Sequence, residues 1–393
     1  MMMRVAAVTL FSCSMIAMQK PTKQIVNAGP VPVGPYSPAV AARGLIYVSG
    51  ALAQDASGAV IGKGDVAAQT RRVIERMREV LVSAGSSLEQ VVSVTVYLKS
   101  AADFQTMNDA YRTFWPYAPP TRTTVITDLV LPDALVEMSM IAVPSGVGRM
   151  VIHPNGWRTA PNPYSYGIKT GDTLFMSGLI SRNGRDNTVV PGDITAQTRV
   201  VLDNAGDILK AAGMTHANVV SARVFLPDAS VFQQMNDSYR TYFPSAPPAR
   251  ATVKAGLTST DYVVEITMIA SSSPRVPLNV GGTPNPNLSA AISAGGRVYL
   301  SGVLGDTADN HGDIAAQTRE TLSRIRRTLQ AAGCTPADVV DGIVYLSDLK
   351  NFAAMNDPYR AFFERSFPAR ATVGVGLVAP DGLVEIMLTA VKP

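Results

Sequence analysis

The stretch "PPARATV" occupies residues 247–253, and two close copies, "PPTRTTV" and "FPARATV", occupy residues 119–125 and 367–373. Each copy places one arginine between a proline and a short β-branched run. These arginines are Arg122, Arg250 and Arg370, which lie 128 (250 − 122) and 120 (370 − 250) positions apart. The chain is therefore an internal triplication, and the three arginines are equivalent residues of its repeats.

Other landmarks keep this step. The motifs "AQTR", "MND" and "VE" recur with it, at Gln69, Gln197 and Gln317, at Asn108, Asn236 and Asn356, and at Glu137, Glu265 and Glu385. A unit of about 120 residues has a common domain size, whereas solenoid repeats are about 20 to 50 residues long. We therefore expect three domains, at residues 22–144, 148–272 and 275–393. The third has lost four residues between its "SG" pair and its glutamine, which indicates a shortened hairpin loop.

The composition is that of a well-packed protein, because 47% of the 393 residues are hydrophobic and 16% are charged. The formal net charge of +4 comes without a run of Lys or Arg, so we expect no nucleic-acid partner and favour an acidic small molecule. Cys13 and Cys334 are the only cysteines, and the three histidines occupy non-equivalent places in the repeats. The sequence therefore predicts neither a metal site nor a cofactor.

The first twenty residues, "MMMRVAAVTLFSCSMIAMQK", differ from the rest of the chain. One early arginine precedes an apolar stretch of about fourteen residues, which is too short to span a bilayer. The segment resembles a signal peptide, and "LFSC" up to Cys13 resembles a lipoprotein cleavage box. The alternatives are an apolar extension or an upstream start codon that is not used. The protein is accordingly expected to be cytoplasmic, or exported to the periplasm if residues 1–20 are a leader.

The first repeat has the pattern of an α+β domain. Its expected elements are a strand at 45–50, a helix between the cap Asp65 and the stop Gly85, a half-buried strand at 91–99, a helix at 103–115, and strands at 121–127 and 134–143. This order predicts one sheet with both helices on one face.

Alternation along the last two strands indicates where their polar residues point. Glu137 is out of phase with Met138 and Met140, and Arg122 is in phase with Thr124. If the methionines pack under the helices, Glu137 and Arg122 lie on the face away from them. That face also carries apolar residues, so it needs a neighbour, which the other two repeats supply.

Several motifs together resemble the RidA/YjgF family of enamine/imine deaminases. They are "GPYSPAV" (34–40), "YVSG" (47–50), "TVYLKSAADFQTMNDAY" (95–111), "PPTRTTV" and "LVEMSMIA" (135–142), and the resemblance spans each repeat almost end to end. It implies chorismate-mutase-like domains that form trimers with ligand pockets between neighbouring subunits. In this chain one polypeptide supplies all three units, so we expect a monomer with internal three-fold pseudo-symmetry.

The resemblance also implies roles for repeated residues. By this resemblance, the arginines bind the substrate carboxylate and the glutamates act on the hydrolytic water. The pocket is completed by tyrosines of the "PYS" motif, serines of the "SG" pair and threonines where many family members have cysteine. These residues are Tyr36 and Tyr164, Ser49, Ser177 and Ser301, and Thr124, Thr252 and Thr372. Leu288 takes the place of the tyrosine in the third repeat, so one pocket lacks that hydroxyl.

The chemistry of these residue types agrees with such roles. A guanidinium fork binds a carboxylate through two charge-assisted hydrogen bonds, which lysine does not reproduce in that geometry. A glutamate whose pKa is raised by desolvation can accept a proton from water and return one to a departing nitrogen. The expected activity is therefore hydrolysis of 2-imino or 2-enamino acids to 2-oxo acids and ammonia, without a metal. The alternative is a protein that binds a small carboxylate such as a 2-oxo acid without turnover.

Structural interpretations stay open for the repeated residues. Arginine and glutamate could pair with each other across an interface, and triplication would preserve that pair equally well. The serines could simply form turns. For the asparagines of "MND" we favour a turn or a cap over a place in the pocket.

Overall fold

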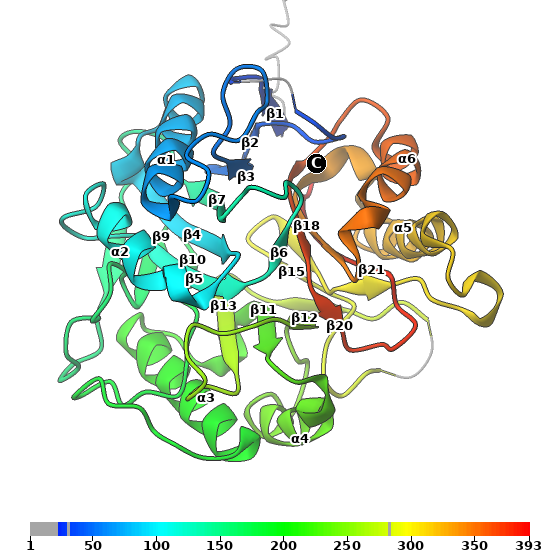
Figure 1. Ribbon diagram of the computed structural model, residues 1–393. Helices are drawn as coiled ribbons and strands as arrows, with labels where there is room; N and C mark the ends of the chain where they lie inside the picture. Colours follow the sequence, from blue (N-terminus) through cyan, green and yellow to red (C-terminus); the bar gives the residue numbers. More distant parts are fainter. Residues whose placement is uncertain (1–22, 30–31, 282–283) are drawn as a thin grey trace, which may run out of the picture.

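The computed structural model describes residues 23–29, 32–281 and 284–393. It contains three tandem α+β domains whose sheets face a common centre and whose helices lie on the outside (Figure 1). The sequence prediction of a single-chain pseudo-trimer is confirmed. Residues 1–20, for which the sequence suggests a leader, lie outside the described residues.

Each domain repeats one order of elements, and we number the domains along the chain. Domain 1 consists of β1 (Lys23–Val26), β2 (Ala39–Ala42), β3 (Leu45–Leu52), α1 (Val66–Ser83), β4 (Val91–Leu98), α2 (Phe104–Arg112), β5 (Thr121–Ile126), β6 (Asp128–Leu129) and β7 (Val136–Ala142). Domain 2 consists of β8 (Met150–Ile152), β9 (Gly167–Thr170), β10 (Thr173–Met176), α3 (Ile194–Ala211), β11 (Val219–Leu226), α4 (Phe232–Tyr242), β12 (Ala249–Lys254) and β13 (Glu265–Ser271). Domain 3 consists of β14 (Val276–Leu278), β15 (Ala291–Ala294), β16 (Arg297–Leu300), β17 (Val303–Leu304), α5 (Ile314–Ala331), β18 (Val339–Leu346), α6 (Phe352–Phe363), β19 (Ala369–Gly374), β20 (Gly376–Leu377) and β21 (Val384–Val391).

The first helix of domain 1 begins and ends where the sequence predicts. In α1 the carboxylate of Asp65 accepts a hydrogen bond from the amide of Ala68 at 2.9 Å, which caps the helix. Gly85 follows with a φ of 75°, a conformation that favours glycine. Gln69 of "AQTR" fastens this helix to the loop before the last strand, because it accepts from the amide of Leu135 and donates to the carbonyl of Asp133.

The arginine-bearing strand lies at one side of each sheet. In domain 1 the order is β1-β2-β3-β7-β4-β5, and β5 runs parallel to β4. Short strands cross between domains at this side: β20 of domain 3 pairs with β12, and β6 of domain 1 pairs with β19. Each arginine strand therefore lies next to a neighbouring domain.

The expectation that residues 91–99 form a half-buried strand is wrong. Of the eight residues of β4, only Ser93 is not buried. One face packs under α1 and α2, and the other meets the sheets of domains 2 and 3, where Tyr97 clusters with Phe225 and Tyr345. A pattern within one repeat cannot reveal this second burial, because the covering surface comes from other repeats.

Unique polar residues break the three-fold symmetry at the centre. Arg223 of β11 donates through Nη2 to Oγ1 of Thr95 in β4 at 3.0 Å, and both line a cavity of about 90 Å³ together with Asp341 of β18. Ile343 stands in domain 3 at the position of Arg223 (343 − 223 = 120). The three domains are therefore not interchangeable around the ring.

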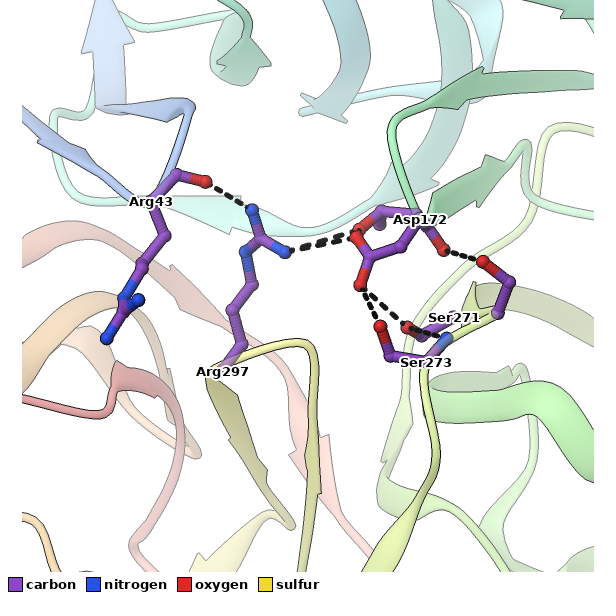
Figure 2. Close-up of polar contacts among 7 residues, drawn as sticks. Arg43, Asp172, Ser271, Ser273 and Arg297 are labelled. Carbon is purple, nitrogen blue, oxygen red and sulfur yellow. Dashed lines mark hydrogen bonds and ion pairs between the residues drawn. The ribbon is translucent and has the colours of Figure 1, made fainter.

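A second polar network joins all three domains (Figure 2). The guanidinium of Arg297 lies 3.5 Å from Oδ1 of Asp172 and donates to the carbonyl oxygen of Arg43. Asp172 accepts in turn from the hydroxyls of Ser271 and Ser273 at 3.2 and 2.6 Å.

No helix in the described ranges is both long and apolar enough to cross a membrane. The same part of the chain holds no group of three or more His, Cys, Asp or Glu side chains arranged to bind a metal ion.

Candidate functional site

The arginine and the glutamate of one domain lie on opposite faces of their sheet. Arg122 is in register with Val94, which belongs to the core under the helices, whereas Glu137 is in register with Tyr97 on the inner face. The expectation that Arg122 shares the face away from the helices is therefore wrong. The parallel pairing of β5 with β4 places Arg122 on the helix side, so it cannot meet Glu137.

Each arginine instead meets the glutamate of another domain. Gly178, next to Ser177 in domain 2, donates its amide proton to the carbonyl of Arg122, and a Cβ at Gly178 would overlap Oε1 of Glu265. The amide of Thr124 hydrogen-bonds the Glu265 carboxyl. The three sites are therefore Arg122 with Glu265 between domains 1 and 2, Arg250 with Glu385 between domains 2 and 3, and Arg370 with Glu137 between domains 3 and 1.

The serine of each "SG" pair fastens the arginine strand across the interface. Ser177 Oγ accepts from the amide of Arg122 at 2.8 Å and donates to the carbonyl of Ser165. Ser301 and Ser49 make the same 2.8 Å contact to the amides of Arg250 and Arg370. Both hydrogen bonds of each hydroxyl go to backbone groups, so the serines position the arginine strands, and Ser177 does not line the cavity beside Arg122.

Aromatic rings surround each guanidinium. Cζ of Arg122 lies 4.9 Å from the ring centre of Tyr111 and 5.8 Å from that of Phe104, both on α2. Tyr164, from the next domain, adds a third ring at 5.9 Å. Such rings stabilise a desolvated cation and hold its plane in one orientation.

The described residues place two aromatic rings, not three, near Arg250. The described aromatic rings near Arg250 are Tyr239 at 4.7 Å and Phe232 at 5.9 Å, whereas Arg370 has Tyr359, Phe352 and also Tyr36 at 5.4 Å. This difference agrees with the place of Leu288 in the third repeat, where domains 1 and 2 have Tyr36 and Tyr164.

All three asparagines of "MND" lie inside helices, and two of them contact an arginine. Oδ1 of Asn236 accepts from Arg250 at 2.6 Å, and Oδ1 of Asn356 accepts from Arg370 at 2.9 Å. The favoured interpretation as a turn or cap is therefore wrong for these two. Asn108 differs, because its amide donates to Asn162 of domain 2 at 3.4 Å. The sequence could not show this contact, because Asn236 of α4 and Arg250 of β12 meet only through tertiary packing.

The glutamates are buried and hold their protons near neutral pH. Glu265 is 4% exposed, and its burial raises its pKa to about 8, although the amide of Thr124 and the guanidinium of Arg122 act in the opposite direction. Burial likewise raises the pKa values of Glu137 and Glu385 to about 8, against the opposing effect of Arg370 and Arg250. All three carboxyls can therefore both donate and accept a proton near neutral pH.

Among the described residues, no ion pair within 4 Å joins Arg122, Arg250 or Arg370 to any carboxylate. Buried polar atoms at the sites also have no hydrogen-bond partner in the described part of the chain: Nη1 of Arg122, Nε and Nη1 of Arg250, Nε of Arg370, Oε2 of Glu385, and Oγ1 of Thr124, Thr252 and Thr372. Buried donors without partners are costly, so these atoms indicate a place for a ligand.

The site between domains 1 and 2 contains the clearest cavity. Its volume is about 170 Å³, and Arg122, Thr124, Tyr164 and Glu265 all line it. A water molecule occupies about 30 Å³ in the liquid, so the cavity has room for a small organic acid. Arg182 also lies in its wall, although no repeated pattern in the sequence singles it out.

Other residues at the sites were missed although they repeat. Phe104 and Tyr111 recur at the arginine's step as Phe232 and Tyr239, and as Phe352 and Tyr359. The serine of "PYS" also recurs: Ser37, Ser165 and Ser289 donate to carbonyls of the neighbouring domain at Phe367, Pro119 and Pro247. Their repetition could have identified them as site residues. An aromatic residue on a helix is usually explained by core packing, however, and a serine in a turn by the turn itself.

Comparison with known proteins supports this organisation. The family model described as endoribonuclease L-PSP matches three times, at residues 26–144, 157–272 and 283–392. A RutC family protein of Sulfurisphaera tokodaii is 47% identical over 109 residues, which are 28% of this chain and 87% of that protein. A protein of Acinetobacter baylyi named 3-aminoacrylate deaminase RutC is 41% identical over 113 residues, which are 29% of this chain and 90% of that protein.

One solved structure shows the same fold over more than one repeat. A chorismatase superposes with a TM-score of 0.52 over 77% of this chain and 93% of its own, at 16% sequence identity. At this level of sequence identity, the likeness shows a shared fold alone.

Proposed function

Since the chain belongs to the endoribonuclease L-PSP (RidA/YjgF) family in three tandem copies, we propose that its inter-domain sites hydrolyse 2-imino or 2-enamino acids to 2-oxo acids and ammonia. The observation that carries the proposal is a buried guanidinium and a buried, protonated carboxyl that line one cavity without pairing with each other. The relative named 3-aminoacrylate deaminase, which matches a single repeat, supports the same class of reaction.

The arginine binds the substrate carboxylate. Nη1 of Arg122 is buried without a partner among the described residues, and the ring of Tyr111 fixes the guanidinium plane. Its strand cannot shift, because Ser177 holds the amide of Arg122 and Gly178 holds its carbonyl. A carboxylate that binds this fork places the adjacent C2 carbon at a fixed distance from Glu265.

The glutamate moves the protons. With a pKa of about 8, Glu265 carries a proton near neutral pH and donates it to the imine nitrogen, which makes C2 more electrophilic. The resulting carboxylate accepts a proton from water as the water oxygen bonds to C2. It then returns that proton to the nitrogen as the C–N bond breaks, and takes up the hydroxyl proton as the C=O bond forms. Water is consumed, ammonia leaves, and the glutamate is again protonated.

Generating imino acids in the presence of the protein tests the proposal. An amino-acid oxidase supplies the imino acid in situ, and its decay is followed with and without the protein. The matched control is the triple variant Glu137→Gln, Glu265→Gln and Glu385→Gln, which keeps hydrogen-bonding side chains of the same size. We expect acceleration by the natural protein alone. Binding of a 2-oxo acid without acceleration would instead identify a carboxylate-binding protein, and arginine-dependent cleavage of RNA would replace the proposal with a nuclease.

A further inference from the structure

The cavity between domains 1 and 2 contains a second guanidinium. Arg182 follows the "SG" strand of domain 2 and lines the cavity together with Arg122 and Glu265. Its Nε donates to the hydroxyl of Tyr262 at 2.6 Å, and its Nη1 donates to the carbonyl of Asn187 at 2.8 Å. Nη2 makes no hydrogen bond to any described residue. The side chain is thus held in place with one nitrogen left for a ligand.

The charges in the cavity wall favour an anionic group beside Arg182. Two of the lining residues are arginines, and two are acidic, Glu265 and Asp261. Glu265 is uncharged near neutral pH because burial raises its pKa to about 8. Asp261 is exposed, and its carboxylate accepts from the hydroxyl of Ser259 at 2.9 Å. The buried part of the cavity therefore has a positive charge that one carboxylate on Arg122 does not fully balance.

The position of Arg182 carries no cation in the other two repeats. Leu52 pairs with Glu137 in domain 1, and Leu304 pairs with Glu385 in domain 3. Two residues after these leucines, domain 1 has Gln54 and domain 3 has Asp306. Domain 2 has Arg182 at this position. The partner Tyr262 is unique as well, because Ala134 and Gly382 occupy its place (262 − 134 = 128, 382 − 262 = 120).

Another arginine near the site of domains 3 and 1 is differently placed. Nη1 of Arg76 donates to the carbonyl of Leu52 at 2.6 Å and to Oε1 of Gln54 at 3.1 Å. Arg76 lines a cavity of about 50 Å³ beside Tyr36, and neither Arg370 nor Glu137 lines that cavity. Arg76 is therefore bound to the loop, whereas Arg182 faces the ligand space.

We infer that the site between domains 1 and 2 is specific for diacids: Arg122 binds the carboxylate next to the imine carbon, and Arg182 binds a second carboxylate at the far end of the substrate. The inference rests on the proposed function for its reaction, but its binding part is independent of turnover. Its substrates are imino acids whose side chain ends in a carboxylate, such as those formed by oxidation of acidic amino acids. Two guanidinium groups in the wall of one cavity favour molecules that carry two carboxylates over those that carry one.

The test isolates this site by its own glutamate. A background of Glu137→Gln and Glu385→Gln leaves Glu265 as the active residue, and Arg182→Gln is then added. Domain 1 has a glutamine, Gln54, at the equivalent position. Gln54 forms a β-bridge with Val60, just as Arg182 forms one with Val189, so the loop should accept glutamine. Arg185→Gln, at an exposed arginine of the same loop that does not line the cavity, is the matched control.

We expect Arg182→Gln to lower kcat/KM for the imino acid of glutamate or aspartate by about 10- to 100-fold, the loss typical of a charged hydrogen bond. The value for the imino acid of leucine should change less than about twofold, and Arg185→Gln should change neither. Equal losses for diacid and monoacid, or no loss for either, would overturn the inference.

Calorimetry separates this inference from the reaction itself. One site of the natural protein should bind 2-oxoglutarate about 10-fold or more tightly than it binds 2-oxobutyrate, and Arg182→Gln should abolish that difference. If this discrimination holds but no imine decays faster, the proposed reaction fails and the diacid site stands. If imines decay faster and the discrimination is absent, the diacid site fails and the reaction stands.

Discussion

The guanidinium of Arg297 and the carboxylate of Asp172 pair at 3.5 Å, and together they join domain 3 to domain 2 beside a backbone carbonyl of domain 1. The side chain of Arg297 is 8% exposed and that of Asp172 is 30% exposed, so solvent screens the pair only in part. The domains at its two ends differ in sequence at this point, because Arg297 is replaced by Leu45 and Thr173 in the other repeats. Because the other repeats lack this arginine, the contact fixes which domain lies next to which within the chain.

Ring closure within one chain predicts a monomer. Short linkers keep the domains at a high effective concentration, and unlike contacts such as Arg297 with Asp172 fix their order. Light scattering should therefore give the mass of one chain, 41.6 kDa less any removed leader. A stable trimer of full-length chains would contradict this.

Removal of the Arg297 side chain should destabilise the ring. Arg297→Met leaves Asp172 without its cation, and we expect the free energy of unfolding to fall by about 1 to 3 kcal/mol, as for a partly buried polar group that loses its partner. Chemical denaturation measures the change. Arg319→Met, at an exposed arginine of α5, is the control and should have almost no effect.

Replacement of the three arginines by lysine should abolish carboxylate-dependent turnover. Arg122→Lys, Arg250→Lys and Arg370→Lys together keep the charge but lose the fork, the ring contacts and, at two sites, the bond to asparagine. We expect kcat/KM to fall about 100-fold or more, with circular dichroism unchanged. Unchanged turnover would exclude the arginines as the carboxylate anchor.

Replacement of the three glutamates by glutamine should separate binding from turnover. The triple variant keeps the shape of each site, so a 2-oxo acid should still bind, while turnover falls by about 100- to 10,000-fold with the loss of proton transfer. Calorimetry and the imine assay measure the two effects on the same samples. A parallel loss of binding and turnover would make the glutamates structural.

The same glutamates predict a pH dependence of stability. Their pKa values are about 8 in the folded chain and 4.5 ordinarily, so between these values the folded state holds protons that the unfolded state has released. The stabilisation is fully present below about pH 4.5 and is lost as the pH rises through about 8. Denaturation at several pH values should show a steeper decline for the natural protein than for the triple glutamine variant. Identical slopes would mean that these carboxyls titrate normally.

Substitution of Leu288 by tyrosine should make the sites more alike. A monocarboxylate such as 2-oxobutyrate should bind the Arg250 site more weakly than the other two, by about 0.5 to 1.5 kcal/mol, the worth of one hydrogen bond. Leu288→Tyr restores the residue type of Tyr36 and Tyr164, so calorimetric titration should then show a single class of sites. Three equal sites before the substitution would refute this assignment.

The internal repeats were enough to predict the fold and the principal residues of the candidate sites from the sequence. The step of Arg122, Arg250 and Arg370 marked the domains, and caps such as Asp65 marked the helices, because both are local features. The side of the sheet on which Arg122 lies could not be derived in the same way, since it depends on the pairing of β5 with β4. Asn236 and Arg182 reach their sites through tertiary packing, and no spacing within one repeat encodes that.

The construction of each site from two domains has a consequence for inheritance. In a trimer of identical subunits, one mutation alters three pockets at once, so any gain at one is tied to the same change at the others. Here Arg182 lines one cavity and Leu288 occurs in one repeat, so a codon change at either leaves the corresponding residues of the other two repeats as they were. Triplication within one chain thus lets selection change one inter-domain site while the other two stay as they were.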